Sequence, residues 1–403
     1  MKIAFLVGNF PALSETFILN QIVGFLEQGH EVDIYADHNR KEAKVHPDVA
    51  NFNLLSRCYY LPENKLGRAM KGIALLLRNW KLIKTVNIFK YGKGILSLRT
   101  LYTADQFNRR GNYDIVYCHF GNIGNIGAII KDAGFMPGKL VTTFHGYDIS
   151  ALVKEKGRDV FQLLFEKGDL FLPISNNWKS ELVKLGCSEQ KISVHRMGID
   201  TDKFALKLRS LSNGETVRLV TIARLVEKKG VEYGIRAVAK VLQKHPNLKL
   251  EYLIVGNGPL RSRLEEVISQ TGMEQHIKLL GWREQQEVIA ILEGAHIFLA
   301  PSITASNGDQ EGIPVVLMES LSMGIPVIST LHSGIPELIQ DTVSGYLVPE
   351  KEVESLVEKI NLLTNHHQEW STMGIKGRQY VEENYNIRTL NDNLIGLFQR
   401  IVS

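Results

Sequence analysis

The sequence has few cysteines, no long apolar run and almost no excess of charge of one sign. Among 403 residues there are 3 cysteines, and 47 Lys and Arg stand against 43 Asp and Glu. Cys58, Cys118 and Cys187 show no metal-binding or redox spacing, which argues against a disulfide scaffold and favours a reducing compartment. A net charge of +4 is too small to indicate nucleic-acid binding by itself.

Segments that would carry the chain into or across a membrane are also missing. No run approaches the roughly 18 apolar residues of a membrane-spanning helix. The first residues, MKIAFLVGNFP, lack the layout of a secretion signal and predict a buried strand instead. We therefore expect a cytoplasmic protein, and its length suits two α/β domains with a large core.

What is present is an alternation of short apolar strands with amphipathic helices. Residues 2–7 and 31–36 predict strands, and Ser14 predicts the N-terminal cap of a helix that reaches Gln28. This alternation favours a doubly wound parallel sheet, which binds ligands at the carboxyl ends of its strands. That rule nominates three loops in the first half of the chain, namely residues 8–14, 117–121 and 145–148.

Residues 297–330 form the most informative stretch. An apolar strand over 297–300 leads into a polar loop that ends at Gly312. Pro314 stands where a helix would begin, the helix continues to Met323, and a second strand follows. The N-terminus of such a helix presents free N–H groups and the positive end of the helix dipole, so this stretch predicts a phosphate site.

Two carboxylates bracket the predicted phosphate site. Glu311 lies in the loop, and Glu319 lies inside the apolar helix, eight positions later. A carboxylate in an apolar helix is costly unless something binds it. From this pair alone, a helix cap for Glu311 and an ion pair for Glu319 explain the pattern as well as a ligand site does.

Two further loops of the second half carry cations and glycines. Arg224 and Lys229 flank the loop after a predicted strand and could neutralise a diphosphate without a metal, whereas Lys228 is expected to be solvated. Residues 256–258 read Gly-Asn-Gly, like the start of a dinucleotide-binding glycine motif. Arg261 stands in place of the third glycine, so we reject that interpretation.

The pair Asp200-x-Asp202 is the one pattern that points to a metal. Such a pair can hold a divalent ion that bridges to a diphosphate, but a lone D-x-D is a weak signal. Its place in a turn-like segment favours a structural role. Residues 205–215 are polar and rich in Ser, Asn and Gly, and they predict the hinge between the two domains.

Residues 65–99 have a different character. They contain nine Lys and Arg and no acid, and Leu, Ile, Trp80 and Phe89 lie between the charges at loosely helical spacing. A basic amphipathic segment with aromatic anchors suits an anionic membrane surface, so we expect peripheral attachment at the inner face of the cell membrane. The alternative is a pair of ordinary helices whose cations are solvated and whose apolar side chains pack inward. No nucleic-acid-binding motif accompanies the basic residues.

A family resemblance rests on the runs EGIPVVLMES, GIPVIST, SGIPELI and SGYLV between residues 311 and 348. They resemble the donor half of the retaining, metal-independent GT-B glycosyltransferases of the glycosyl transferases group 1 family, which E-x7-E marks. The likeness is strongest over residues 217–348, although Ala223 replaces a usual glycine. The likeness is weaker at residues 9–17 and 145–148, and residues 9–17 are similar to the subgroup that serves exopolysaccharides and surface glycans of the colanic-acid type.

The resemblance implies the GT-B fold, in which two Rossmann-like domains with doubly wound parallel sheets face a cleft. It implies an N-terminal acceptor domain over residues 1–205 and a nucleotide-sugar donor domain over residues 206–384. A C-terminal helix over residues 385–403 is expected to return to the first domain.

The resemblance also implies the reaction. A hexose would pass from a UDP- or GDP-sugar to a glycan or a polyprenyl-diphosphate-linked acceptor with retention, without a further cofactor or metal. A GT-B nucleotide-sugar 2-epimerase is the alternative. The implied catalytic residues are His145, Arg224, Lys229 and Glu311, and the implied donor-nucleotide residues are Gly8, Gly256, Trp282, Arg283, Gly312, Ile313, Val315, Val316 and Glu319. For Trp282, ordinary packing is the alternative to contact with the base.

Overall fold

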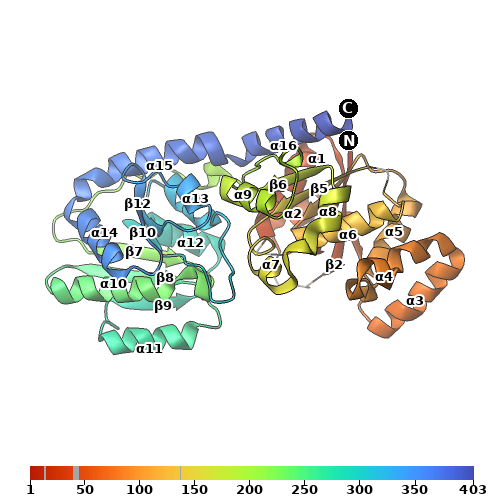
Figure 1. Ribbon diagram of the computed structural model, residues 1–403. Coiled ribbons are helices and arrows are strands. Elements are labelled where there is room, and N and C mark those ends of the chain that lie inside the picture. The colour runs from red at the N-terminus through yellow and green to blue at the C-terminus, as the bar shows by residue number, and fades with distance from the viewer. Residues whose placement is uncertain (13–14, 40–44, 137) are drawn as a thin grey trace. The chain divides into compact units, whose positions relative to one another are not determined.

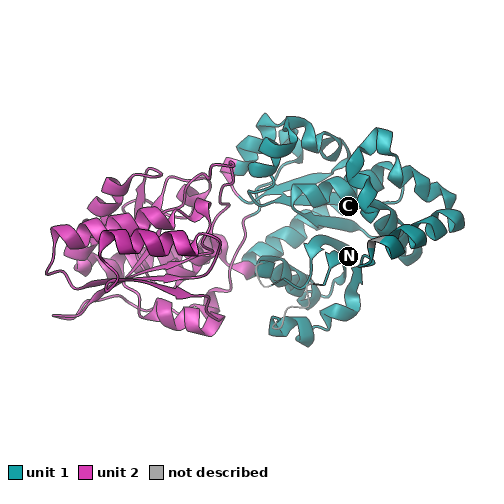
Figure 2. Cartoon of the chain, turned by 90° about the horizontal axis from the view of Figure 1, so that it is seen from below, with its two compact units in different colours: residues 1–174, 178–195, 388–403 teal, residues 175–177, 196–387 magenta. Residues whose placement is uncertain are grey.

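The chain divides into two compact units, which are described separately. The computed structural model describes residues 1–12, 15–39, 45–136 and 138–403, so the predicted cap Ser14 lies outside the described residues. Unit 1 and unit 2 are shown in different colours in Figure 2. Unit 1 comprises Met1–Ile174, Trp178–His195 and Arg388–Ser403, and unit 2 comprises Ser175–Asn177 and Arg196–Ile387.

The described residues of unit 1 contain a six-stranded parallel sheet in the order β3-β2-β1-β4-β5-β6. The strands are β1 (Lys2–Asn9), β2 (Glu31–His38), β3 (Cys58–Tyr60), β4 (Ile115–His119), β5 (Lys139–Phe144) and β6 (Leu170–Pro173). The helices around it are α1 (Thr16–Glu27), α2 (Pro47–Asn51), α3 (Lys65–Arg78), α4 (Ile88–Tyr91), α5 (Arg99–Arg110), α6 (Gly121–Asp132), α7 (Ala151–Lys156), α8 (Gln162–Lys167), α9 (Asn176–Lys184) and α16 (Ile387–Val402).

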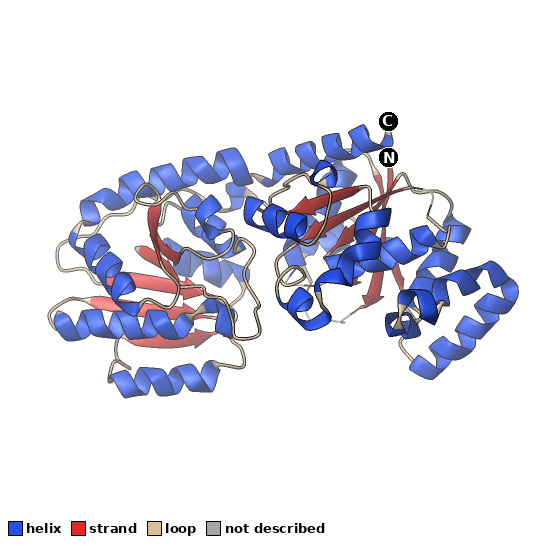
Figure 3. Cartoon of the chain, viewed as in Figure 1, coloured by secondary structure: helices blue, strands red, loops and turns tan. Residues whose placement is uncertain are grey.

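Unit 2 repeats this architecture with a parallel sheet in the order β12-β11-β10-β7-β8-β9. Its strands are β7 (Val217–Ile222), β8 (Leu250–Val255), β9 (Ile277–Gly281), β10 (Ile297–Ala300), β11 (Val327–Thr330) and β12 (Gly345–Val348). Its helices are α10 (Val231–Lys244), α11 (Arg261–Thr271), α12 (Gln285–Glu293), α13 (Val315–Ser322), α14 (Val353–Asn365) and α15 (Trp370–Tyr385), drawn in Figures 1 and 3.

The two sheets share one strand order, in which the direction of winding reverses between the first and the fourth strand. This reversal lies between β1 and β4 in unit 1 and between β7 and β10 in unit 2. It is the order of a Rossmann-like sheet, and ligands bind at such a reversal, outside the carboxyl ends of the strands. The predicted fold class, two Rossmann-like parallel sheets, is confirmed.

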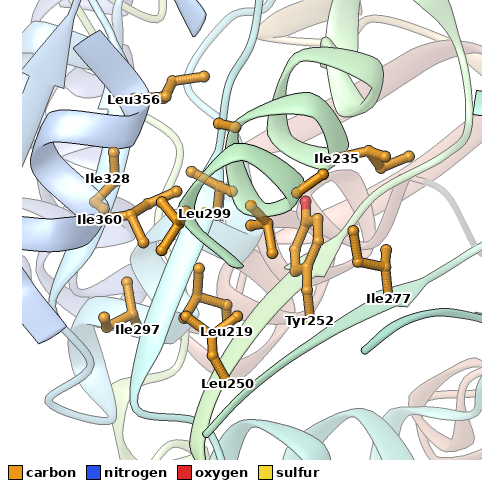
Figure 4. Close-up of a cluster of buried hydrophobic side chains, with 14 of the residues drawn as sticks. Leu219, Ile235, Leu250, Tyr252, Ile277, Ile297, Leu299, Ile328, Leu356 and Ile360 are labelled. Carbon is orange, nitrogen blue, oxygen red and sulfur yellow. The ribbon is translucent and has the colours of Figure 1, made fainter. Parts of the chain in front are cut away.

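The core of unit 2 shows why its strands are short apolar runs. Both faces of a parallel sheet are covered, so every position along a strand favours an apolar side chain. Leu219, Tyr252 and Leu299 of neighbouring strands are fully buried against Ile235 of α10 (Figure 4). The Tyr252 hydroxyl lies 2.6 Å from Thr221 Oγ1, so this buried phenol is hydrogen-bonded.

The main segment of unit 2 begins at Arg196 because the residues that follow pack into its hydrophobic core. Ile199 and Phe204 are buried in the core of unit 2, and Ile199 also forms a parallel bridge with Asn386. The chain therefore enters unit 2 at Arg196, before the polar segment 205–215 that predicted the hinge.

The C-terminal helix α16 packs on unit 1. Phe398 stacks on Phe25 with ring centroids 5.4 Å apart and lies edge-on to Tyr117 at 5.1 Å. A Cβ at Gly24 would lie 2.0 Å from Asn391 Nδ2, so a glycine lets α16 approach α1 closely. These contacts place residues 388–403 in unit 1.

Gly230 joins the two loops that flank the strand reversal in unit 2. Its φ of +59° and a Cβ that would lie only 1.8 Å from the Pro301 carbonyl oxygen both require glycine. The Ile303 N–H donates to the Lys228 carbonyl oxygen at 2.8 Å. The loop after β7 therefore rests directly on the loop after β10.

We expect Gly230→Ala to destabilise the protein more than Gly272→Ala. Gly272 has a similar φ of +69° but open space where its Cβ would lie, so alanine there should cost about 1–2 kcal/mol for the left-handed backbone alone. The clash at Gly230 should add about 1–3 kcal/mol. Urea unfolding of both variants measures the difference, and equal midpoints would contradict the close contact between the loops.

Candidate functional site

Five loops of unit 2 meet at one edge of its sheet. All strands of this sheet run parallel, so the loops after β7, β8, β9, β10 and β11 leave from the same edge. The loops after β7 and β10 flank the strand reversal, where ligands of such sheets bind. They carry Arg224, Lys229, Glu311 and the start of α13, so most of the predicted site residues lie along this edge.

A buried ion pair joins the two central loops. Lys229 Nζ lies 3.0 Å from Glu311 Oε2, and Lys228 Nζ lies 3.9 Å from Glu311 Oε1. Burial raises the pKa of the Glu311 carboxyl, but the two lysine charges outweigh burial and the pKa lies below its usual value. The carboxylate is therefore ionised. A helix cap, the alternative from the sequence, is not observed, because no side chain caps α13.

Lys228 corrects an expectation. The sequence predicted a solvated lysine, but Lys228 Nζ lies 3.1 Å from Asp309 Oδ1 and donates to the Gln310 carbonyl oxygen at 3.3 Å. The prediction was wrong because the loop after β10 folds back over this lysine and offers it both oxygens. Lys228 therefore holds the loop, and Lys229 faces Glu311.

His332 and Glu350 fix the same loop and were missed by the sequence analysis. The buried His332 ring accepts the Glu311 backbone N–H at Nε2, at 3.0 Å. Since a backbone N–H can only donate, the ring proton lies on Nδ1, which is 2.5 Å from Glu350 Oε1. Glu350 also accepts the Thr304 N–H at 2.7 Å. No motif signals this pair, because its members are brought together only by the fold.

The N-terminus of α13 is free, as the phosphate-site prediction requires. The backbone N–H groups of Ile313, Val315 and Val316 make no hydrogen bond to any residue that the structure describes, and the same holds for Gly312. Pro314 has no N–H to offer. No acidic side chain lies in the first turn, so these groups and the helix dipole can receive an anion.

Glu319 is a carboxylate for which the described part of the chain supplies neither an ion pair nor a hydrogen bond. The ion pair that the sequence allowed for it is therefore absent among these residues. Burial raises the pKa of its carboxyl to about 7. A carboxylate that is largely withdrawn from water and has no donor is unfavourable unless a ligand supplies hydrogen bonds.

The outer loops place the remaining predicted residues of unit 2. Arg224 is exposed and has no ion-pair partner among the described residues. The Trp282 side chain is 60% exposed, so ordinary core packing, the alternative for this residue, is wrong. The Arg283 guanidinium donates to the Trp282 carbonyl oxygen at 3.1 Å. The Gly256 N–H donates to the Gly281 carbonyl oxygen at 2.9 Å and so is engaged within the protein.

The predicted residues of unit 1 lie at the carboxyl ends of β1 and β5. His145 Nε2 lies 3.1 Å from His119 Nδ1, and burial lowers the pKa of His145 to about 3, so this ring is neutral. Asp148 accepts the N–H groups of His145 and Gly146, both at 3.0 Å. Gly8 lies within β1, and no atom lies within 4 Å of the position of its Cβ.

Asp200 has the structural role that the sequence favoured. Its carboxylate accepts the Asp202 N–H at 3.1 Å and lies 3.8 Å from Lys203 Nζ. No group of three or more His, Cys, Asp or Glu suited to a metal occurs among residues 1–12, 15–39, 45–136 and 138–403. In the same ranges, no helix is both long and apolar enough to span a bilayer.

Comparison with solved structures places the fold in the GT-B class. HepE of Anabaena, solved in complex with UDP and glucose, has a TM-score of 0.76 at 16% identity and covers 99% of this chain and 100% of its own. Sucrose-phosphate synthase of Thermosynechococcus elongatus has the same TM-score and identity, with 100% and 99% covered. The fold is therefore the two-domain GT-B fold.

Sequence comparisons identify the family. The model for "Glycosyl transferases group 1" matches residues 202–380, and that for "Glycosyltransferase Family 4" matches residues 14–203. The amylovoran biosynthesis glycosyltransferase AmsK of Erwinia amylovora is 36% identical over 412 residues, with 100% of both chains covered. WcaL of Salmonella typhimurium, whose name provisionally assigns it to colanic acid biosynthesis, matches equally well. The chain belongs to the glycosyl transferases group 1 family and is a glycosyltransferase.

We expect Glu319→Gln to change how stability depends on pH. The folded carboxyl has a pKa of about 7 against an ordinary 4.5, so the folded state keeps a proton that the unfolded chain loses. The free energy of unfolding of the unmodified protein should therefore fall between about pH 5 and about pH 8, by on the order of 3 kcal/mol. The variant should lack this decrease. Urea unfolding across this range measures it, with the exposed Glu383→Gln as control. Parallel pH profiles for all three proteins would contradict an unpaired, partly buried Glu319.

Proposed function

We propose that the protein transfers a sugar from a UDP- or GDP-sugar to a glycan or polyprenyl-diphosphate-linked acceptor in exopolysaccharide biosynthesis, with retention and without a metal. One observation carries this proposal: a free helix N-terminus, two cations and an unpaired carboxylate lie along one edge of a Rossmann-like sheet. In a nucleoside diphosphate, the phosphates would bind the helix N-terminus and the cations, and the ribose hydroxyls would bind the carboxylate. The names of AmsK and WcaL support the pathway.

The helix end and the cations would hold the diphosphate. The diphosphate oxygens accept hydrogen bonds from the free N–H groups of Ile313, Val315 and Val316. The side chains of Arg224 and Lys229 supply positive charge. As the glycosidic bond breaks, negative charge grows on the leaving phosphate. Donors that are already in position stabilise this charge without reorganisation, and removing one typically costs about 10²–10³ in rate.

The carboxylates would hold the sugars. Glu319 accepts hydrogen bonds from the ribose hydroxyls, which supplies the donors that its carboxylate lacks, and the base lies near Trp282 and Arg283. Glu311, ionised and with Oε1 free of hydrogen bonds within the described chain, accepts from hydroxyls of the donor sugar. The roles that the family resemblance gives to His145 and Gly8 remain predictions.

Retention would follow from return of the leaving group on one face. The outgoing phosphate takes the proton of the acceptor hydroxyl, and the acceptor oxygen joins the sugar on the face from which the phosphate left. No protein nucleophile and no cofactor is required. The nucleotide-sugar 2-epimerase alternative differs in one respect: it would release free nucleotide and an epimerised sugar from the donor alone, without an acceptor.

We also propose that the protein meets its acceptor at the membrane. A polyprenyl-linked acceptor is held in a bilayer, and residues 65–99 are the segment whose composition suits an anionic surface.

Arg224→Ala is expected to lower kcat about 10²–10³-fold while leaving stability unchanged, because Arg224 is exposed and unpaired among the described residues. Lys229→Ala should lower the rate similarly, but it should also destabilise the protein because it removes the closest cation from buried Glu311. Arg263→Ala, an exposed arginine of α11, is the control.

The same variants are titrated with UDP- and GDP-sugars by calorimetry. Retained affinity and turnover in Arg224→Ala and Lys229→Ala would remove both cations from the site. Turnover of the donor alone to an epimer would favour the epimerase.

Transfer should survive EDTA, because a helix end and two cations neutralise the diphosphate. Activity is measured with and without the chelator on protein dialysed beforehand. Loss of activity on chelation and its rescue by Mg²⁺ or Mn²⁺ would revive Asp200 and Asp202 as metal ligands.

A further inference from the structure

The segment 65–99 turns apolar side chains toward solvent. Phe89 is 99% exposed, Leu77 84% and Trp80 72%. The exposed apolar residues of this segment are Leu66, Met70, Ile73, Leu77, Trp80, Ile83, Ile88, Phe89 and Leu96. We call them the apolar face. Few soluble proteins leave so many large apolar side chains together in water without a partner.

The apolar face is not a helix surface that has missed the core. On α3, Leu66, Met70, Ile73 and Leu77 recur at the spacing of one helical stripe, and all are exposed. The segment packs inward through other residues, among them the fully buried Leu82 and the buried Ile95. The alternative from the sequence, an apolar stripe that packs inward, is therefore wrong for α3.

Cations alternate along the segment with the residues of the apolar face, and several have no ion-pair partner among the described residues. Arg78 pairs with Asp105, and Lys90 pairs with Asp132. Lys71, Lys81, Lys84 and Lys93 have no ion-pair partner in the part of the chain that the structure describes. The segment contains no acid, so unneutralised positive charge and apolar surface lie on the same elements.

A buried arginine fastens this segment beside the predicted ligand edge of unit 1. The Arg99 guanidinium donates to the Val7 carbonyl oxygen at 2.8 Å, and its Nε lies 2.8 Å from Asp37 Oδ1. Val7 lies near the carboxyl end of β1 and Asp37 near that of β2. Arg99, the first residue of α5 and the last of the segment, is thus held close to the edge where ligands of such sheets bind.

We propose that the apolar face of residues 65–99 inserts into the headgroup region of an anionic bilayer. The unpaired lysines then form ion pairs with the phosphates of the lipid headgroups. This inference rests on the proposed function only for its purpose, which is access to a lipid-linked acceptor. Insertion differs from attachment by charge alone, because aromatic and aliphatic side chains hold the protein after the charges are screened. A second copy is a poor occupant, since a self-complementary contact through this face would set like charges against each other.

The test is flotation of the full chain with vesicles of phosphatidylcholine alone or mixed with equal parts of phosphatidylglycerol. We expect binding to the anionic vesicles that persists in part at about 1 M salt, where the Debye length is about 3 Å. Lys81→Ser with Lys84→Ser should weaken binding at low salt about fivefold per lysine. The matched control is Lys139→Ser with Lys376→Ser, which removes two exposed lysines elsewhere.

The triple variant Leu77→Ser, Trp80→Ser and Phe89→Ser tests insertion itself. It should fold normally because all three side chains are exposed, and it should lose the salt-resistant binding. The control is the double variant Leu55→Ser with Leu208→Ser, which changes two leucines exposed elsewhere. This control should keep the salt-resistant binding. Insertion would be overturned if salt abolished all vesicle binding of the unmodified protein, or if the triple variant kept the binding that resists about 1 M salt.

Two further outcomes separate this inference from the proposed function. Calorimetric binding of a nucleotide-sugar without any flotation would overturn the inference and leave the function standing. Flotation without nucleotide binding would do the reverse. Dimers that the triple variant abolishes, in the absence of vesicle binding, would assign the apolar face to a second copy.

Discussion

The site of unit 2 depends on one buried contact, the carboxylate of Glu311 between Lys229 and Lys228. It joins the loop after β7 to the loop after β10 across the strand reversal. Because α13 begins shortly after Glu311, the position of this carboxylate decides where the free helix N-terminus lies. Removing one partner of a buried pair leaves an uncompensated charge and typically costs about 3–5 kcal/mol. His332 and Glu350 hold the same residue through its backbone N–H, so side chain and main chain of Glu311 are fixed independently.

The pKa values of the two carboxyls that bracket the helix start are shifted in opposite directions. The chain itself supplies the counter-charges of Glu311, and the pKa of that carboxyl is lowered. For Glu319, burial acts alone and the pKa of the carboxyl is raised. The first arrangement stabilises the fold, whereas the second costs stability in the free protein. A cost of this kind at one position of an otherwise apolar helix is expected where a ligand completes the hydrogen bonds.

The sequence predicted the elements of unit 2 closely, because each strand is a short apolar run bounded by turn residues. It also predicted that Glu319 needs a partner, since an apolar helix offers none. It did not predict the His332–Glu350 pair or the contacts of Lys228, because these join loops that only the fold brings together. For α3, helical spacing revealed an apolar stripe but not its direction. Which side of a helix meets the core is decided by the neighbouring elements, and here Leu82 and Ile95 take the inward positions instead.

The repeated architecture raises the question of why one helix start should take the donor phosphates and not its counterpart. In each unit a helix follows the fourth strand of the sheet, α6 after β4 and α13 after β10. The N-terminus of α6 is already occupied, because Asp148 accepts the Gly121 N–H at 2.8 Å. The N-terminus of α13 carries no side-chain cap. An anion at α6 would have to displace a carboxylate, whereas one at α13 meets unpaired donors, so of these two helix starts the one at α13 is open to a phosphate.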